Sequence, residues 1–571
     1  MSYIDVQVVS NKKICVWERG DDGKLVTKLF PFKDYNYLFM RDNTGATTRY
    51  KTIYDEPLRQ LVFNTRKELS DFKKLRPDIV YESDVPIKNK VLIDEYHDCQ
   101  SDLPVNILYF DIEVDFDLDE GRGYPTPKNP YGEINAISCF HSRDNSYFMF
   151  NPSHLEGKIT LSDEKYDGYP VQIVWCDTEA EMLRLFSAFL DEYSVDILTA
   201  WFGDGFDIPY IMARAELLFG EAAALTLLCR DGFEATRRDF INEYAEEVWE
   251  WKLAGRHHVD LMLLYKKFQP GEKRSFKLDS VCEEELGEKK IAYSSDLGTL
   301  YRKDPQHFFE YSLHDSRLLM RLDRKKKIVD LAILMARDMC CLPPDVTGSV
   351  KIIETAFIKY CRKRGNYVLP DKHNKDQEDF PGAIVYDSIE GRQEWMFTID
   401  LGSLYPSSIM MLGLSKETML YQCKNSYYDY VRIMTRTDDE IVLEDIRTGE
   451  ILTEKASEIE SLLRQHGWTI SGNGTIFNGR MGLLASFVEE GFHQRAQYKK
   501  LMAQATDEAS KVRYFLYQNV MKLRNNSVYG ILAQPSFRMN DVRLAASTTL
   551  TGQVISKWQA YYGNKLLKEG I

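Results

Sequence analysis

The stretch Val105-Asn106-Ile107-Leu108-Tyr109-Phe110-Asp111-Ile112-Glu113 places two acids directly after an apolar run. The run from Val105 to Phe110 is typical of a buried β-strand, and Asp111 and Glu113 follow at its C-terminal end. Because side chains alternate along a strand, the two carboxylates are expected on the same face. Such a pair also occurs at solvated strand ends, so it indicates a site only together with further acids.

The sequence around this strand predicts several domains. From Val105 to about Lys327, short apolar runs alternate with helical patterns, which favours an α/β domain. Residues 1–103 alternate apolar and polar side chains in short runs, as in a small β-rich domain. Residues 328–369 and 486–525 have helical patterns. With 571 residues, the chain is too long for a single hydrophobic core.

The bulk composition excludes some classes of protein and leaves others open. Hydrophobic residues make up 44% and charged residues 28%, and no apolar stretch is long enough to span a membrane, so no membrane partner is expected. The ten cysteines include no C-x-x-C pair, which argues against a structural zinc site and for reduced thiols in a cytoplasm. The net charge of −14 does not exclude a nucleic-acid enzyme, because a local cleft can still be positive.

Two later acids make the pair after the first strand more informative. Asp207 lies among apolar neighbours, and Asp315 follows Tyr311 by four residues on a helical pattern. Four carboxylates can hold two divalent ions about 4 Å apart, one generating a hydroxide and the other stabilising the leaving oxygen. Tyr311 shares a helix face with Asp315 and could orient the attacking water. The alternative is a tyrosine packed in the core.

In this order and spacing, the acids resemble the three exonuclease motifs of family B DNA polymerases. The matching sequences are Phe110-Asp-Ile-Glu113, Phe206-Asp207 and Tyr311-x-x-x-Asp315. The resemblance implies an RNase H-like fold, the four acids as Mg²⁺ ligands with Mn²⁺ as a substitute, and a catalytic role for Tyr311. Phe202 stands where the family usually has asparagine, so it either stacks on a DNA base or is buried.

A second resemblance begins at Asp400, which ends an apolar run expected to be a strand and could ligate Mg²⁺ beside a nucleoside triphosphate. Asp400-Leu-Gly-Ser-Leu-Tyr-Pro-Ser407 resembles the first polymerase motif of the same family. The resemblance implies that Asp400 is catalytic and that it and Leu401 bind metal. The backbone from Leu401 through Ser403 to Leu404 would cradle phosphates, and Tyr405 would exclude a ribose 2′-hydroxyl.

The helical patterns over residues 486–525 carry cations at helical spacing. Arg495 and Lys499 share one helix face, Lys522 and Asn526 share another, and Tyr529 follows three residues later. Such cations can neutralise a triphosphate, although this spacing is also typical of solvated helices. Lys522-x-x-x-Asn526-Ser-x-Tyr529-Gly530 resembles the fingers motif of the family, and Arg495-x-x-x-Lys499 matches its facing helix. The resemblance implies that the dNTP is bound by Arg495, Lys499, Lys522, Asn526 and Tyr529. Phe380 replaces a tyrosine of a further family element.

One family element is absent from the sequence. The family's second acidic motif, typically Asp-Thr-Asp, occurs nowhere in residues 1–571, and the nearest sequence is Thr437-Asp438-Asp439. The layout most resembles the polymerases of T4-like bacteriophages. The resemblance implies four parts: an N-terminal domain (1–103 with 328–370), an exonuclease domain (104–327), a partial palm (371–460 with 535–571) and helical fingers (461–534).

Three hypotheses follow from these observations. The first, which we favour, is that the chain is the large part of a replicative polymerase with proofreading. A C-terminal fragment would supply the missing acid and the thumb in trans. The alternative explanation for the missing elements is that the chain is a truncated product. The second is a stand-alone 3′–5′ DNA exonuclease with an inactive polymerase region, and the third is a non-catalytic DNA-binding factor. The first implies primer-template DNA and dNTPs as ligands, a sliding clamp as a further candidate partner, and a bacterial host cytoplasm if the protein is viral.

Overall fold

The computed structural model describes the whole chain apart from residues 1, 21, 45–47, 77–78, 99–104, 117–122, 162–165, 242–246, 270, 294–295, 373–378, 388–389, 393–399 and 570–571. The chain forms two compact units. Unit 1 consists of Met1–Phe32 and Asp94–Thr347, and unit 2 of Lys33–Ile93 and Gly348–Ile571. The predicted mixed α/β, multidomain class is confirmed, whereas the predicted domain boundaries stay a prediction.

Unit 1 is built around a six-stranded mixed sheet of order β11-β10-β9-β8-β12-β15. Its strands are β8 (Ile107–Val114), β9 (Ile134–His141), β10 (Ser146–Pro152), β11 (Val171–Cys176), β12 (Ile197–Ala200) and β15 (His257–Asp260). The central strand β8 pairs with β9 antiparallel and with β12 parallel. It is buried almost throughout, which agrees with the apolar run that predicted it, but it continues past Phe110 and includes both acids.

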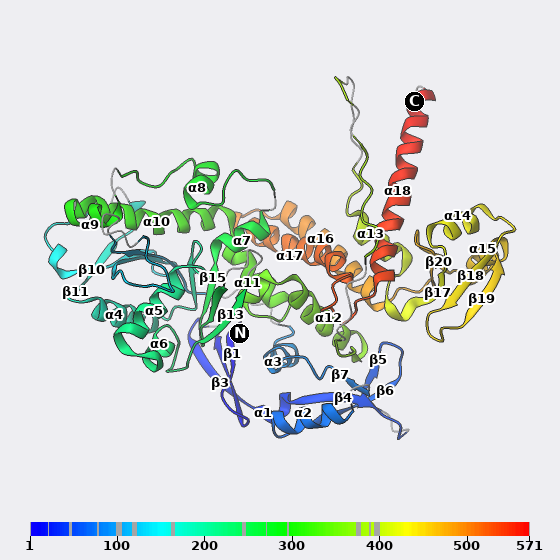
Figure 1. Cartoon of the computed structure of the whole chain (residues 1–571), viewed down its shortest axis with the longest axis horizontal. Helices are drawn as coiled ribbons and strands as arrows, with labels where there is room; N and C mark the ends of the chain where they lie inside the picture. Colours follow the sequence, from blue (N-terminus) through cyan, green and yellow to red (C-terminus); the bar gives the residue numbers. More distant parts are fainter. Residues whose placement is uncertain are drawn as a thin grey trace. The chain divides into compact units, whose positions relative to one another are not determined.

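Helices cover both faces of this sheet (Figure 1). On one face lies α10 (Pro305–Lys326). The Ser138 hydroxyl of β9 donates a hydrogen bond to the backbone carbonyl of Ser312 in this helix at 2.8 Å. On the other face lie α4 (Glu179–Glu192), α5 (Asp207–Phe219) and α6 (Glu221–Leu227). Apolar side chains of β8, β9, β10, α4 and α5 form one core cluster, so the sheet and its helices are a single packed layer structure.

The remaining elements of unit 1 surround this layer structure. They are β1 (Ser2–Val8), β2 (Lys13–Arg19), β3 (Leu25–Pro31), β13 (Thr236–Ile241), β14 (Glu247–Lys252), α7 (Leu261–Phe268), α8 (Leu278–Leu286), α9 (Leu297–Lys303), α11 (Ile328–Asp338) and two 3₁₀ turns (Ser153–Leu155, Pro343–Thr347). The fully buried Arg19 of β2 donates to Asp196 at 2.6 Å, just before β12, and so ties the N-terminal sheet to the central one.

Unit 2 contains two five-stranded sheets. The first, of order β16-β5-β6-β4-β7, joins β4 (Tyr37–Arg41), β5 (Tyr50–Thr52), β6 (Pro57–Val62) and β7 (Val80–Tyr81) to β16 (Tyr367–Val368). The second, of order β19-β18-β17-β21-β20, consists of β17 (Met419–Cys423), β18 (Glu440–Asp445), β19 (Ile451–Lys455), β20 (Thr469–Ile470) and β21 (Thr475–Phe477). Segment 1–103 therefore contributes strands to both units.

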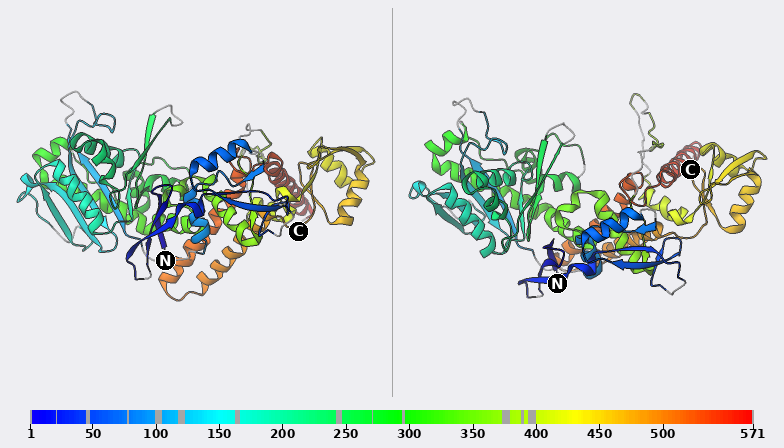
Figure 2. Two further views of the ribbon diagram at one scale, coloured as in Figure 1. Left: turned by 90° about the horizontal axis from the view of Figure 1, so that it is seen from below. Right: turned by 60° about the horizontal axis from the view of Figure 1, so that its bottom comes forward.

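Long helices complete unit 2. The helices α16 (Leu483–Gln504) and α17 (Glu508–Leu532) lie side by side as an antiparallel pair, drawn in orange in Figure 2. The others are α2 (Arg66–Leu75), α12 (Ser349–Gly365), α13 (Leu404–Leu412), α14 (Tyr427–Thr435), α15 (Ala456–His466), α18 (Val542–Glu569) and a 3₁₀ turn (Lys416–Thr418); α1 (Phe32–Tyr35) and α3 (Ile87–Glu95) lie where the units join in sequence. The strand predicted before Asp400 lies outside the described residues. Within the described part of the chain, no helix is long and apolar enough to cross a membrane.

Candidate metal centre and nucleotide pocket

Three of the predicted acids meet at one point in unit 1. Asp111 and Glu113 project from β8, and Asp315 projects from α10 on the face that packs against this strand. One carboxylate oxygen from each residue lies within 4.8 Å of the other two. Glu113 and Asp315 are 6% and 1% exposed, so this is an enclosed group of oxygen ligands.

The fourth predicted acid, Asp207, lies beside this group. It is the first residue of α5 and is buried, and its Oδ1 accepts a hydrogen bond from the backbone N–H of Ile112 at 3.4 Å. Ile112 stands between Asp111 and Glu113, so α5 begins directly against the acid pair. The structure thus brings together acids that are up to 204 residues apart in the predicted pattern, from Asp111 to Asp315.

Burial and mutual repulsion raise the pKa values of these acids. Burial, with Asp207 and Asp315 nearby, holds the pKa of Asp111 well above its ordinary value. Burial raises the pKa of Glu113 to about 8, with a further contribution from Asp315, and burial raises the pKa of Asp207 to about 7. A divalent cation would relieve this repulsion, and an all-oxygen ligand set is what Mg²⁺ and Mn²⁺ prefer.

Lys290 is a site residue that the sequence pattern did not reveal. Its ammonium Nζ lies 2.5 Å from Asp315 Oδ2 and 3.4 Å from the Tyr311 hydroxyl. Tyr311 is 5% exposed, yet its hydroxyl faces this charged group, so it is both packed and part of the cluster. No motif spacing marks Lys290; only the contact across 25 positions of sequence identifies it.

A histidine and two acids hold the loop that precedes Asp207. His258 Nδ1 lies 2.7 Å from Asp204 Oδ1, and the backbone N–H of Asp204 donates to Asp260 Oδ2 at 3.2 Å. Gly203 lies directly against the His258 ring and has no room for a side chain there. These contacts fix the backbone leading into α5, so His258 and Asp260 support the position of Asp207 without contacting it. Neither was predicted as a site residue.

Phe202, the departure from the family pattern, lies in the same loop. It is 51% exposed and has a φ of 66°, which is uncommon for a bulky residue. Its ring covers Gly205, whose lack of a side chain permits the contact. The alternative that Phe202 is buried is therefore wrong, and base stacking stays a prediction.

A pocket of about 540 Å³ in unit 2 contains most of the predicted nucleotide-binding residues. Its lining includes Asp400, Leu401, Ser403, Leu404, Tyr405, Asn526 and Tyr529. The turn before α13 aims the helix N-terminus at this space, a common arrangement for binding phosphate, and Ser403 there has a φ of 57°. The Tyr405 ring packs against Tyr529 with centroids 4.3 Å apart, which fixes the wall formed by the predicted 2′-hydroxyl barrier.

Three predicted cations lie outside this lining. Arg495 and Lys499 project from α16 and Lys522 from α17, nearer the tip of the helix pair than Asn526. Arg495 Nε donates to Gln518 Oε1 across the pair at 3.4 Å, two helical turns before Asn526. The structure therefore places these cations along the helix pair, toward its tip from the pocket residue Asn526, and their contact with a triphosphate stays a prediction.

Comparison with known proteins finds two family models that match separate parts of the chain. Residues 73–281 match the family model described as DNA polymerase family B, exonuclease domain, and residues 346–568 match the model DNA polymerase family B. The DNA-directed DNA polymerases of Escherichia phage RB69 and Enterobacteria phage T4 are 26% and 24% identical to the chain, covering 99% of it and 67% of their own lengths. A DNA polymerase delta catalytic subunit from Schizosaccharomyces pombe is 26% identical over 80% of the chain and 39% of its own length. Because the exonuclease and polymerase models both match, in the order that the motifs predicted, the chain belongs to the family B DNA polymerases.

Proposed function

We propose that unit 1 is a 3′–5′ DNA exonuclease with an RNase H-like fold that removes nucleotides from a strand end. The observation that carries this proposal is the enclosed group of carboxylate oxygens from Asp111, Glu113 and Asp315, with Asp207 beside it. When bound, two Mg²⁺ ions would supply a hydroxide at neutral pH and stabilise the leaving oxygen. The four acids would hold these ions between the strand and its two flanking helices.

The other residues of the cluster position the reacting groups. The Tyr311 hydroxyl, 3.4 Å from Lys290 Nζ, would accept a hydrogen bond from the lysine and hold the attacking water by its own proton. Lys290 would offset the negative charge that grows on the phosphate during hydrolysis. The exposed ring of Phe202 would stack on a terminal base, in place of the contact that asparagine makes in the family.

For unit 2, we propose a dNTP site of a replicative polymerase. The 540 Å³ pocket supports it, because Asp400, the turn from Leu401 to Leu404 and Tyr405 all line one space. Asp400 and the Leu401 backbone would hold Mg²⁺, and α16 with α17 would act as fingers that present Arg495, Lys499 and Lys522 to the triphosphate. A pocket that gathers these residues favours a polymerase over an exonuclease with a vestigial region.

Nucleotidyl transfer at this pocket needs at least one further carboxylate. Residues 1–571 contain no Asp-Thr-Asp sequence, and one acid cannot hold two metals against a triphosphate. We therefore propose that extension of a primer requires further polypeptide, which carries that acid and a thumb and which can act in trans. In that assembly the exonuclease would proofread.

The exonuclease is tested with the 571-residue chain and single-stranded DNA labelled at its 5′ end. We expect a ladder that shortens from the 3′ end with Mg²⁺, no degradation in EDTA, and no degradation by an Asp111→Ala/Glu113→Ala variant. Asp115→Ala is the matched control, because Asp115 continues the same alternation but pairs with Arg302 at 2.8 Å outside the acid group. Unchanged degradation by the double variant would refute the site.

The polymerase proposal has a separate test. The 571-residue chain should bind dNTP but should not extend a primer on a template without added polypeptide. Extension by the purified chain alone would show that the required carboxylates are already present within residues 1–571.

A further inference from the structure

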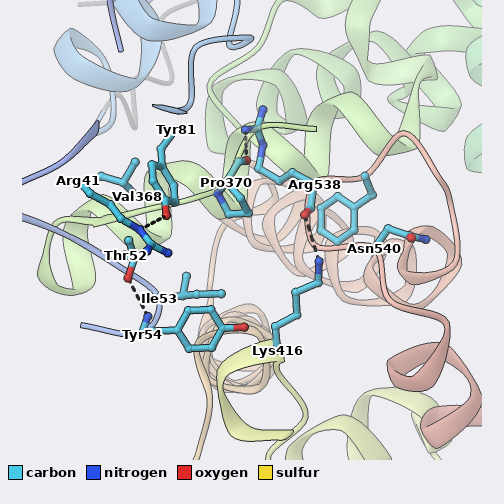
Figure 3. A pocket seen from close by; sticks show the side chains of 11 residues that line it. Arg41, Thr52, Ile53, Tyr54, Tyr81, Val368, Pro370, Lys416, Arg538 and Asn540 are labelled. Atoms are coloured by element: carbon cyan, nitrogen blue, oxygen red, sulfur yellow. Dashed lines mark hydrogen bonds between the residues drawn. The ribbon is translucent and has the colours of Figure 1, made fainter. Parts of the chain in front are cut away.

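A second pocket in unit 2 shares no lining residue with the Asp400 pocket or with the acid group. It has a volume of about 220 Å³ and lies where the first sheet of the unit meets the segment after α17 (Figure 3). Three aromatic residues, Tyr54, Tyr81 and Phe537, and three cations, Arg41, Lys416 and Arg538, line it. It belongs to no function argued above.

The apolar part of this pocket has a buried floor and one exposed ring. Ile53, Val368 and Phe537 are 6%, 0% and 2% exposed, and they form an apolar floor. Tyr54 is 45% exposed, and the Arg447 guanidinium lies 5.1 Å from its ring centroid, which holds the ring in place. A fixed aromatic ring beside an apolar floor is the surface on which a planar base stacks.

The polar lining of the pocket consists of cations and neutral groups, and the acids that pair with Arg41 and Arg538, Glu56 and Glu354, lie outside the lining. No carboxylate is among its lining residues, although the chain as a whole carries a net charge of −14. Arg41 is half exposed; its Nε donates a hydrogen bond to the Tyr81 hydroxyl at 3.2 Å, and its guanidinium forms an ion pair with Glu56 at 3.1 Å. Figure 3 shows the guanidinium of Arg41 and the ammonium of Lys416 on opposite sides of the lining residues, with the Tyr54 hydroxyl directed toward Lys416, whose ammonium donates to the Arg538 carbonyl at 3.4 Å.

Arg538 forms the back of the pocket and is held by other groups. Its buried guanidinium donates to Glu354 at 2.6 Å and to Pro370 O at 2.8 Å, so its charge is fixed where it lies. Its Nε, however, has no hydrogen-bond acceptor among the described residues. A buried donor without an acceptor is costly and is commonly found where a ligand or water completes the structure.

We propose that this pocket binds one nucleotide unit of single-stranded DNA, with the base against Tyr54 and the apolar floor and a phosphate between Arg41 and Lys416. The volume is below the range of about 300–1,000 Å³ usual for larger ligands and suits one base. A base that enters it must be unpaired. The site is non-catalytic and goes beyond the proposed function, because it adds a DNA contact that shares no residue with the acid group or with the Asp400 pocket.

Binding is measured with the 571-residue chain in EDTA, which stops hydrolysis, and a fluorescein-labelled dT12 probe. We expect Tyr54→Ala to weaken binding about tenfold, since one stacked base contributes that much or more. Tyr54→Phe is the matched control and should bind as wild type does, because it keeps the ring. Arg41→Gln should reduce the slope of the logarithm of the binding constant against the logarithm of the salt concentration by about one, the value expected for one lost phosphate contact.

A second measurement locates the base directly and does not depend on affinity. A dT12 probe carrying 5-iodouracil should photocrosslink to the peptide that contains Tyr54, and excess dTMP should compete only weakly. Strong competition by dTMP would overturn the assignment to a strand and favour a free nucleotide. Equal dT12 affinity of wild type and Tyr54→Ala, with crosslinks only elsewhere, would overturn the site altogether. Neither result depends on the nuclease acids, so failure here is distinct from failure of the exonuclease.

Discussion

Without divalent ions, a Glu113→Gln variant should be more stable than the wild-type protein at pH 8, although it should lose nuclease activity. Glu113 is 6% exposed, and burial raises its pKa from 4.5 to about 8. Below pH 4.5 the carboxyl is protonated in both the folded and the unfolded chain, so it costs nothing. As the pH rises from 4.5 to 8, only the unfolded chain releases the proton, and stability is lost over this window.

The size of the effect follows from the two pKa values. A difference of about 3.5 units corresponds to at most about 5 kcal/mol, and we expect about 2–5 kcal/mol because the neighbouring acids share the protons. Glutamine has the shape of the glutamic acid and no charge at any pH, so the variant avoids this loss. Mg²⁺ should reverse the order, because it binds the folded wild type and lacks a ligand in the variant.

The assay is amide hydrogen exchange of peptides from β8, at pH 6 and pH 8, in EDTA and in Mg²⁺. This reports on unit 1 without requiring that the whole chain unfold in one step. After correction for the intrinsic exchange rate, protection of β8 in EDTA should fall from pH 6 to pH 8 in the wild type more than in Glu113→Gln. Identical pH dependence of the two proteins, with no effect of Mg²⁺ on the wild type, would refute the electrostatic reasoning.

Three further outcomes are expected. Lys290→Met removes the cation beside Asp315, so the midpoint of thermal unfolding should fall in EDTA at pH 8 and recover with Mg²⁺; an unchanged midpoint in EDTA would count against the contact. Phe202→Asn should stabilise the fold by about 1 kcal/mol or less, because asparagine adopts a φ of 66° with less strain, and the midpoint should therefore rise slightly; a lower midpoint would contradict this. Tyr405→Ala should bring the affinities for dTTP and UTP, measured by equilibrium dialysis, closer together, and unchanged discrimination would reject Tyr405 as the 2′-hydroxyl barrier.

The sequence predicted those parts of the fold that depend on local pattern. The apolar run before Asp111 predicted β8, and the helical spacing of Tyr311 and Asp315 agrees with α10. The strand is longer than its apolar run because Ile112 continues the alternation between the two acids, and Glu113 is buried and Asp111 half-buried rather than left at an exposed end.

Other features depend on contacts that no spacing encodes. Lys290 reaches Asp315, and His258 reaches the loop before Asp207, through the folding of distant segments, and neither lies in a recognisable pattern. The exposure of Phe202 depends on its left-handed backbone and on Gly205, which a single sequence does not reveal. Arg495, Lys499 and Lys522 were placed by motif alone, and the pocket formed around Asp400 does not include them. Their role, like that of the other site residues, stays a prediction.

The most direct test of the exonuclease is a crystal of the protein with a short single-stranded DNA and Mn²⁺, examined by anomalous diffraction. Two Mn²⁺ peaks about 4 Å apart should lie among Asp111, Glu113, Asp207 and Asp315, with the 3′-terminal phosphodiester between them. The absence of Mn²⁺ from these carboxylates, in a protein that still degrades DNA from its 3′ end, would contradict the assignment of the nuclease to this group.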